Sequence, residues 1–143
     1  MNVMITGCAG FIGSHAVEGF ITAGHKVIGV DCMSYAGSMS NMESFIDDIK
    51  FYEADIIDTD KIREIVRRHS IEWIINFAAE THVDNSIHSV APFIHSNING
   101  VHSLLQVCRG QECNLFQIST DEVYGSTTDV SFIETDTLNP RNP

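Results

Sequence analysis

Basic residues are scarce in this sequence: 8 Lys and Arg stand against 19 Asp and Glu, which gives a formal net charge of −11. No basic run or patch occurs, so nucleic acid and anionic membrane surfaces are poor candidate partners. The sequence also lacks an apolar run of about 18 residues that could cross a membrane. Its first residues, MNVMITGCAG, lack the charged start of a signal peptide. These absences predict a cytoplasmic protein that binds neither nucleic acid nor membranes.

Cysteine pairs and metal-binding spacings are absent as well. The chain has four cysteines: Cys8, Cys32, Cys108 and Cys113. None belongs to a Cys-x-x-Cys motif, so we expect reduced thiols. His88, His95 and His102 recur every seven residues, and on a helix this spacing separates neighbours by about 10 Å along the axis. Because that distance is too long for one shared ion, we interpret them as polar or interface side chains and predict no metal site.

The distribution of apolar residues predicts the fold class. With 143 residues, of which 43% are hydrophobic, the chain is long enough for one domain with a buried core. Apolar runs predict five strands, over residues 2–6, 25–31, 49–55, 72–80 and 114–120. Helical periodicity predicts helices over residues 11–24, 58–70 and 90–110, and a short helix near 42–47. This alternation is typical of an α/β protein with a doubly wound parallel sheet, the Rossmann fold. Right-handed crossovers place the carboxyl ends of its strands at one edge, where ligands bind.

Two of the predicted helices carry specific expectations. The first has four apolar residues at helical spacing: Ile12, Ala16, Phe20 and Ala23. In the second, Asp58 is the candidate N-cap, and Ile62, Ile65 and Val66 lie on one face. Both patterns indicate a helix.

The turn after the first strand is a candidate phosphate-binding loop. Gly7, Gly10 and Gly13 form Gly-x-x-Gly-x-x-Gly, one residue longer in its first gap than the usual dinucleotide fingerprint. Glycine there lets the backbone approach a diphosphate, whose charge is met by the N-terminus of the following helix, near Ile12. Asp31 ends the next strand at about the expected offset, where a carboxylate accepts hydrogen bonds from the ribose hydroxyls and repels a 2′-phosphate. The pattern therefore favours NAD over NADP; the alternative for Asp31 is a solvated residue at a strand end.

The ends of the third and fourth strands offer further contacts. Asp55 and Ile56 provide a side-chain acceptor and a backbone N–H that could frame an adenine edge. Phe77, Ala78 and Ala79 end the fourth strand with mostly small residues, against which a cofactor could lie flat. Tight packing is the alternative reading of these residues.

Five motifs occur in order along the chain: TGCAGFIGSH, VD, AD, FAAETHVDNSI and STDEVYG. On these motifs the chain resembles, over essentially all of its 143 residues, the nucleotide-sugar 4,6-dehydratases that act on dTDP-glucose or UDP-glucose, members of the extended short-chain dehydrogenase/reductase family. The resemblance implies NAD as cofactor, a nucleotide sugar as substrate, and a homodimer for the full-length enzyme. Its most specific element is the Thr-Asp-Glu triplet, because epimerases of the superfamily usually carry Ser-Ser or Ser-Thr followed by other residues there.

The resemblance also assigns a cofactor site. Beside Gly7, Gly10 and Gly13, this site comprises Phe11, Ile12, Asp31, Cys32, Met33, Ser34, Asp55, Ile56, Phe77, Ala78, Ala79, Glu80, Thr81 and Ser96. Thr81 is expected to reach the sugar as well, and Ser96 to lie near the nicotinamide half. Asn85, Ser96 and Val101 depart from the family's frequent Arg, Thr and Thr. We expect the first departure to alter substrate contacts.

The resemblance gives chemical roles to Thr120, Asp121 and Glu122. The family's reaction moves a hydride from carbon 4 of the hexose to NAD, and the 4-keto group that results acidifies the proton on carbon 5. Glu122 is expected to remove this proton, protonated Asp121 to donate to the departing carbon 6 hydroxyl, and Thr120 to bind the oxygen at carbon 4. The hydride then returns to carbon 6. The alternative is that the two acids cap a helix near Val123.

The family also needs a Tyr-x-x-x-Lys pair, but none of the three tyrosines is followed four positions later by a lysine. We therefore expect residues 1–143 to be the NAD-binding N-terminal part of a longer enzyme, with the last strands of the sheet and the substrate lobe missing. On its own the chain should bind NAD weakly and turn over no sugar. Two alternatives stay open: a nucleotide-sugar 4-epimerase or decarboxylase of the same family, and a non-catalytic NAD-binding module.

Overall fold

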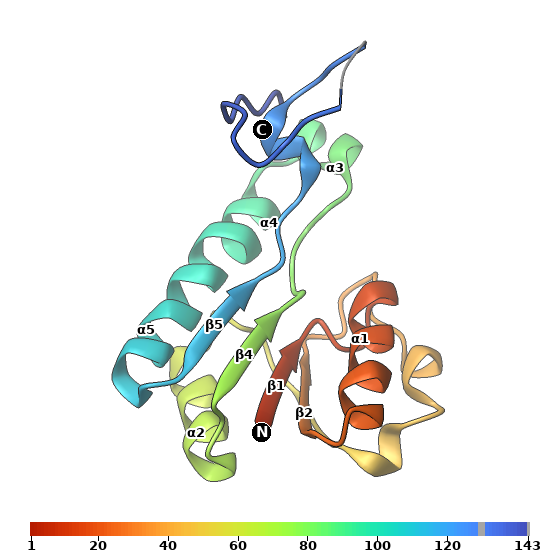
Figure 1. Cartoon of the computed structure of the whole chain (residues 1–143), viewed down its shortest axis with the longest axis vertical. Coiled ribbons are helices and arrows are strands. Elements are labelled where there is room, and N and C mark those ends of the chain that lie inside the picture. The colour runs from red at the N-terminus through yellow and green to blue at the C-terminus, as the bar shows by residue number, and fades with distance from the viewer. Residues whose placement is uncertain (129–130, 143) are drawn as a thin grey trace.

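The computed structural model describes residues 1–128 and 131–142 of the chain. Five parallel strands form one sheet in the order β3-β2-β1-β4-β5 (Figure 1). The strands are β1 (Asn2–Thr6), β2 (Lys26–Asp31), β3 (Lys50–Glu53), β4 (Trp73–Asn76) and β5 (Asn114–Gln117). The first strand lies in the centre, and the chain progresses outward first to one side and then to the other. This is the doubly wound arrangement that the sequence predicts.

Helices flank this sheet. The α-helices are α1 (Phe11–Thr22), α2 (Thr59–His69), α3 (Val83–His88), α4 (Ala91–Phe93) and α5 (Val101–Gln111), and a π-helix, η3 (Ile94–Gly100), joins α4 to α5. The short 3-10 helices are η1 (Met39–Met42), η2 (Ile46–Asp48) and η4 (Asp121–Tyr124). Within the described ranges, no helix is both long and apolar enough to cross a membrane.

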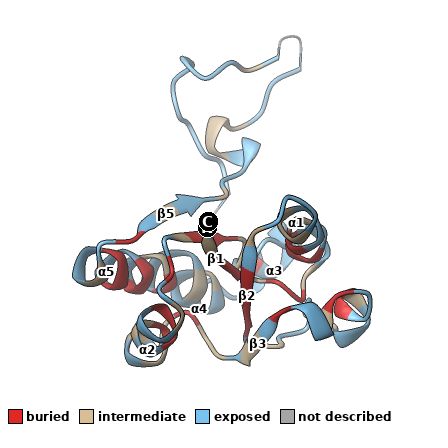
Figure 2. Cartoon of the chain, turned by 60° about the horizontal axis from the view of Figure 1, so that its bottom comes forward, coloured by how far each residue is buried: buried red, intermediate tan, exposed pale blue. Residues whose placement is uncertain are grey.

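Two hydrophobic clusters, one on each face of the sheet, hold the layers together. Successive side chains of a strand point to opposite faces. Met4 of β1 therefore joins the cluster that includes residues of α2 and α5, whereas Val3 and Ile5 join the cluster that includes Val17 of α1. All four side chains are fully buried, and Figure 2 shows the buried segments between the layers. Burial on both faces explains why the central strands are nearly continuous in apolar residues.

The second predicted helix is confirmed in detail. The Asp58 carboxylate accepts a hydrogen bond from the backbone N–H of Lys61 at 3.0 Å and caps α2. Ile62, Ile65 and Val66 are buried against the sheet. The sequence pattern was sufficient here because an acidic cap and an amphipathic face are local signals.

The helix predicted over 11–24 is confirmed as α1, but the apolar spacing that predicts it does not coincide with the face that the helix buries. This spacing consists of Ile12, Ala16, Phe20 and Ala23. The buried residues of α1 are instead Gly13, Ser14 and Val17, while Ile12 is 65% exposed and Phe20 only partly buried. The reason is that Gly13 packs directly on the backbone of the turn after β1. This contact orients the helix with Gly13, Ser14 and Val17 toward the sheet.

Other elements differ from their predicted bounds. β4 ends at Asn76, so the following residues leave the sheet as a loop. The helix predicted over 90–110 is a helical run from Ala91 to Gln111, but its middle is π-helical. Near 42–47 the structure has the two turns η1 and η2 instead of one helix. Helix α3 was not predicted, because its sequence VDNSIH has no apolar periodicity.

A polar chain crosses the sheet at the carboxyl ends of β1, β4 and β5. Thr6, Asn76 and Gln117 are register partners on these three strands. The Thr6 hydroxyl donates to the side-chain oxygen of Asn76, whose amide donates to the side-chain oxygen of Gln117 at 2.8 Å. Thr6 and Asn76 are fully buried, so sliding one strand past another would leave buried polar groups without partners. These hydrogen bonds therefore fix the register of the strand ends that carry the candidate site.

The segment after β5 extends beyond the edge of the sheet (Figure 1). It folds back on itself: the backbone N–H of Asn139 donates to the carbonyl oxygen of Val123 at 2.9 Å. The ring of Tyr124 stacks on that of Phe132 with 5.3 Å between ring centroids. These contacts hold η4 and residues 131–142 together.

Candidate functional site

The turn after β1 brings α1 into close contact with the backbone. Gly7 has φ +69°, and a Cβ there would lie 2.7 Å from the backbone nitrogen of Ala78. A Cβ on Gly13 would lie 2.0 Å from the carbonyl oxygen of Gly7. Only glycine fits at these two positions, one because of its dihedral angle and both because of the space. The predicted glycine pattern thus has a steric cause in this fold.

The N-terminus of α1 is open at this turn. Its N-cap residue is Gly10, so no side chain caps the helix, and the first-turn amide groups stand at the carboxyl edge of the sheet. Phe11 and Ile12 expose 76% and 65% of their surface there. Free amide groups and the helix dipole together can bind a diphosphate without a basic side chain.

Asp31 is held beside the turn. It is 7% exposed, and its two carboxylate oxygens accept hydrogen bonds from the backbone N–H groups of Ala9 at 2.9 Å and Met33 at 2.8 Å. Each oxygen keeps a second lone pair for another donor. The segment after β2 then turns sharply, since Met33 has φ +54°, and Cys32 and Ser34 are exposed in it. The carboxylate is thus fixed by the backbone before any ligand arrives.

The end of β3 lies next to Asp31, because the backbone N–H of Ala54 donates to the Asp31 carbonyl oxygen at 2.9 Å. The side chain of Asp55 accepts from the backbone N–H of Ile57 at 3.1 Å and contacts His95 Nε2 at 2.9 Å. Ile56 is 4% exposed, so its side chain belongs to the core and only its backbone is available to a ligand.

The loop after β4 is held in place by hydrogen bonds to the π-helix η3. Phe77 and Ala78 are partly buried beside the glycine turn, and Ala79 and Thr81 are exposed. The backbone N–H and carbonyl of Glu80 pair with the side-chain oxygen and nitrogen of Asn97, at 2.9 and 2.8 Å. Ser96, partly buried, precedes Asn97 on η3. Asn97 therefore gives this loop a defined position.

The triplet follows the end of β5. Thr120, Asp121 and Glu122 are all exposed. The Thr120 hydroxyl oxygen accepts from the backbone N–H of Glu122 at 3.2 Å and its proton points to Asp121 Oδ1 at 3.3 Å. Thr120 is thus the side-chain cap of η4, and the alternative that the two acids cap this helix is wrong. The Glu122 carboxylate accepts from the side-chain amide of Asn142 at 2.7 Å.

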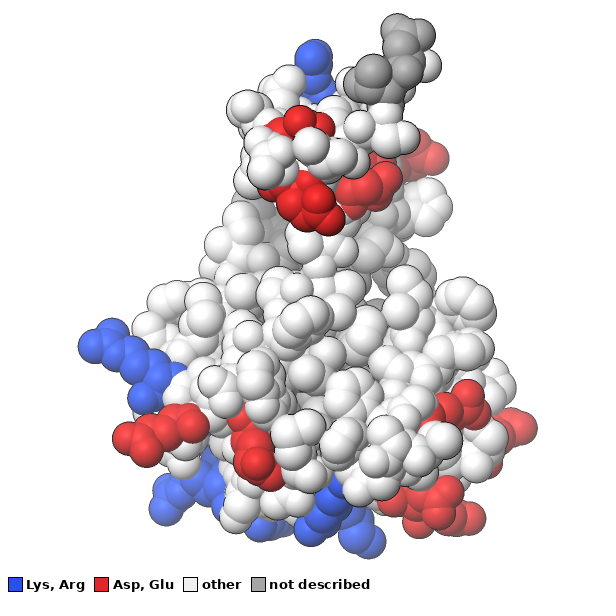
Figure 3. All heavy atoms as spheres, in the orientation of Figure 1, with Lys and Arg blue, Asp and Glu red and all other residues white. Residues whose placement is uncertain are grey.

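The parallel sheet brings these five strand ends to one edge. In sheet order the edge carries Asp55, Asp31, Gly7, Ala78 and Thr120. Lys and Arg lie mostly toward the other end of the molecule in the view of Figure 3. An anionic ligand at this edge would therefore rely on backbone amide groups.

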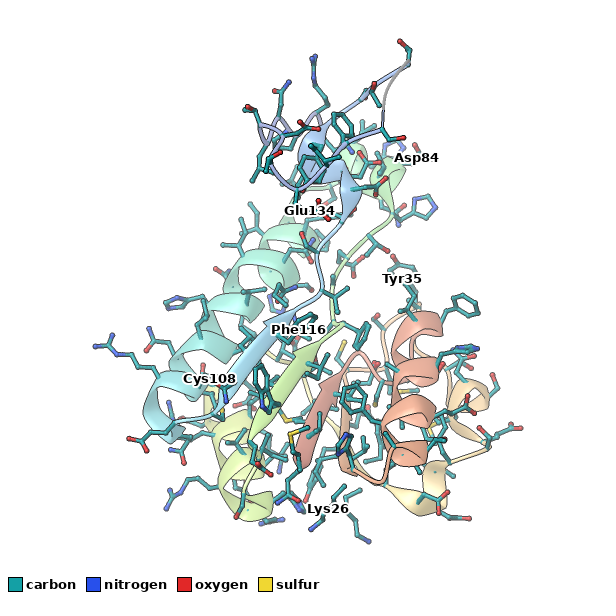
Figure 4. The ribbon with its side chains drawn as sticks, in the orientation of Figure 1. Lys26, Tyr35, Asp84, Cys108, Phe116 and Glu134 are labelled. Carbon is teal, nitrogen blue, oxygen red and sulfur yellow. The ribbon has the colours of Figure 1, made fainter. Side chains whose placement is uncertain are left out.

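Sequence reasoning missed four residues at this edge: Tyr35, His95, Asn97 and Asn142. Tyr35 lines a cavity of about 320 Å³ with Glu80, Asn85, His88, Ser89, Pro92 and Phe93, and Figure 4 shows it reaching from the segment after β2. Desolvation, together with the nearby Glu80 carboxylate, raises the pKa of Tyr35 above its usual 10. The sequence did contain a signal for Tyr35, because this residue lies in the Ser- and Gly-rich loop that follows Asp31. The positions of the other three residues depend on contacts between distant segments of the chain.

Comparisons with known proteins agree on one family. The family model described as GDP-mannose 4,6 dehydratase matches residues 4–143. The low-salt glycan biosynthesis protein Agl12 of Haloferax volcanii is 42% identical over the whole chain, which covers 47% of that protein. The dTDP-glucose 4,6-dehydratase of Mycolicibacterium smegmatis is 34% identical over the whole chain, which covers 44% of it.

Solved structures match over almost the whole chain. The dTDP-glucose 4,6-dehydratase DesIV of Streptomyces venezuelae, with NAD and TYD bound, gives a TM-score of 0.93 at 34% identity over 99% of this chain and 46% of that one. The UDP-glucose-4-epimerase of Stenotrophomonas maltophila, with bound NAD, gives 0.93 at 30% identity over 99% and 44%. The chain therefore spans less than half the length of each of these relatives.

Proposed function

Because the chain belongs to the family that the GDP-mannose 4,6 dehydratase model describes, we propose that it carries the cofactor site and part of the catalytic site of an NAD-dependent nucleotide-sugar 4,6-dehydratase. Its substrate would be dTDP-glucose or UDP-glucose, and its product the 4-keto-6-deoxy sugar. The observation that carries the proposal is the position of Thr120, Asp121 and Glu122 at the same sheet edge as the glycine turn and Asp31.

NAD suits the chemistry of this edge. The open N-terminus of α1 would receive the diphosphate, and Asp31 would accept from the ribose hydroxyls with the lone pairs that Ala9 and Met33 leave unused. The same carboxylate would repel a 2′-phosphate. When bound, NAD supplies the hydride acceptor that oxidation at carbon 4 of the sugar requires.

The triplet divides the acid–base work. Thr120, whose hydroxyl donates to Asp121 in the unliganded chain, would turn this proton to the oxygen at carbon 4. Glu122 would take the proton from carbon 5, and Asp121 would give a proton to the leaving hydroxyl at carbon 6. Opposite roles for adjacent acids require different surroundings. The two carboxylates have different partners in the unliganded chain: Glu122 accepts from the side-chain amide of Asn142, and Asp121 accepts from the hydroxyl of Thr120.

Two other functions remain as competitors. A 4-epimerase is supported by the solved epimerases, which match the fold as well as the dehydratases do. The acid pair favours dehydration, since only loss of water at carbon 6 needs it. The second competitor is a non-catalytic NAD-binding module, which would use the cofactor site and not the acid pair.

The proposal includes a homodimer built on the helical run from α4 to α5. Leu104 and Val107 of this run are buried against the sheet. Ile94, Ile98 and Leu105 expose 45%, 61% and 52% of their surface on its other side. This apolar face supports packing against a second copy of the chain.

The direct test of the function uses the protein expressed from its complete reading frame, with dTDP-glucose or UDP-glucose that carries deuterium at carbon 4. A dehydratase is expected to give a product lighter by one water, with the deuterium at carbon 6, as mass spectrometry and NMR can show. An epimerase would give a product of unchanged mass, and a binding module would give none. Either result with both substrates would contradict the proposal, whereas residues 1–143 alone are expected to give no product.

A further inference from the structure

The π-helix η3 joins the two halves of the candidate cofactor site. On one side Asn97 holds the loop after β4 through both backbone groups of Glu80. On the other side His95 contacts Asp55, in the loop after β3. In the sheet order the loop after β4 is next to the glycine turn, and the loop after β3 lies on the other side of the turn, beyond the end of β2. A π-helix inside a longer helix is rare and frequently marks a functional site.

The last residue of η3 sets how closely the helix approaches this loop. A Cβ on Gly100 would lie 2.4 Å from Cδ1 and 2.7 Å from Cγ1 of Ile56. Glycine therefore lets the helix backbone pack directly on the buried Ile56 side chain. This contact brings the preceding turn of the helix, with His95, over Asp55. Two adjacent residues of the loop are thus held by two residues of one π-helix.

Both oxygens of the Asp55 carboxylate have a defined partner. Oδ1 accepts from the backbone N–H of Ile57 at 3.1 Å, and Oδ2 lies 2.9 Å from Nε2 of His95. An ionised carboxylate only accepts hydrogen bonds, so Nε2 carries the proton and donates. The two donors fix the plane of the carboxylate and leave each oxygen a free lone pair. His95 and Asp55 are partly accessible, with 46% and 39% of their side-chain surface exposed, so a ligand can reach the pair.

We propose that His95 is a positioning residue for adenine recognition: it orients the Asp55 carboxylate so that a free lone pair faces the 6-amino group of the cofactor's adenine. The inference rests on the proposed function in that NAD must lie along this edge with its adenine over the ends of β2 and β3. It goes further in assigning the choice of base to a contact between η3 and the loop after β3. A base with a carbonyl group at position 6, as in nicotinamide hypoxanthine dinucleotide, would place an acceptor against the carboxylate and bind more weakly.

The test compares NAD with nicotinamide hypoxanthine dinucleotide by titration calorimetry, on the protein from the complete reading frame. The wild type is expected to bind NAD roughly tenfold more tightly, because a hydrogen bond to a charged group is lost with the other dinucleotide. His95→Ala should bring the two dissociation constants to within about twofold, mainly by weakening NAD. His95→Gln should restore much of the preference, since its amide can still donate to Asp55. His102→Ala, on the same helical run and with no contact to Asp55 in the described structure, should leave both constants unchanged.

The outcomes separate this inference from the proposed function. If the wild type binds NAD but shows no preference between the two dinucleotides, the role of His95 is overturned and NAD binding stands. If His95→Ala weakens both dinucleotides by the same factor, His95 only supports the loop and the inference is again wrong. If the wild type binds neither, the proposed cofactor site itself fails. Melting temperatures of the variants show whether any of them is unfolded. If His95→Ala is unfolded, the preference of His95→Gln between the two dinucleotides decides whether the inference holds.

Discussion

Replacing Gly13 with alanine is expected to weaken NAD binding at least a hundredfold, a loss of about 2.7 kcal/mol or more, and to lower the free energy of unfolding by about 3 kcal/mol. The added methyl group would lie 2.0 Å from the carbonyl oxygen and 2.8 Å from the carbonyl carbon of Gly7. Both atoms belong to the backbone of a turn that packs on Ala78, so neither can move aside. The helix must instead shift outward, which separates its N-terminal amide groups from the place where the diphosphate is expected.

A matched control is available on the same helix. Apart from the neighbouring backbone of α1 itself, nothing lies within 4 Å of the position that a Cβ on Gly19 would occupy, and alanine there should stabilise the protein by roughly 0.5–1 kcal/mol. Urea unfolding gives the stabilities and calorimetric titration the affinity for NAD. If Gly13→Ala binds NAD as well as Gly19→Ala does, the glycine turn is not a dinucleotide site.

Replacing Glu122 with glutamine is expected to lower kcat by a factor of about 10² to 10⁴, the usual contribution of a general base. Glutamine cannot take up the proton from carbon 5. Its side-chain oxygen can still accept from Asn142, so η4 should keep its structure and KM and NAD affinity should change little. The measurement is steady-state kinetics with either nucleotide sugar, on the protein from the complete reading frame.

The control for this substitution is Glu112→Gln, at the far end of α5 from the site (Figure 1). This variant removes the same charge but should keep full kcat. A Glu122→Gln variant with full kcat would show that the base is another residue. If the variant instead has a higher KM, a lower kcat and a lower melting temperature, Glu122 has a structural role.

The sequence predicted what local patterns determine. Strands that are buried on both faces must be apolar throughout, which makes β1, β2 and β4 visible as runs. Glycine at positions 7 and 13 is visible because the turn admits nothing larger. Asp58 and the apolar face of α2 are equally local. The position of the site at the carboxyl edge could be predicted from the topology alone, because right-handed crossovers between parallel strands place all carboxyl ends at the same edge of the sheet.

The parts that could not be predicted depend on contacts between distant segments. The buried face of α1 is set by the approach of Gly13 to Gly7, which outweighs the apolar spacing of Ile12 and Phe20. The π-helical turns of η3 have no sequence signature that we recognised, and they direct His95 and Asn97 toward loops 40 and 17 residues away. The resemblance gave roles to Thr120, Asp121 and Glu122. It did not indicate that the Thr120 hydroxyl caps η4.

The central claim is that a dinucleotide lies across the carboxyl edge of this sheet, and a crystal structure of the protein with NAD tests it most directly. The account predicts the diphosphate against the backbone amide groups at the start of α1, ribose hydroxyls donating to Asp31, and the adenine amino group at Asp55. A well-occupied NAD molecule bound elsewhere on the protein, with this turn empty and Asp31 bound only by Ala9 and Met33, would contradict it.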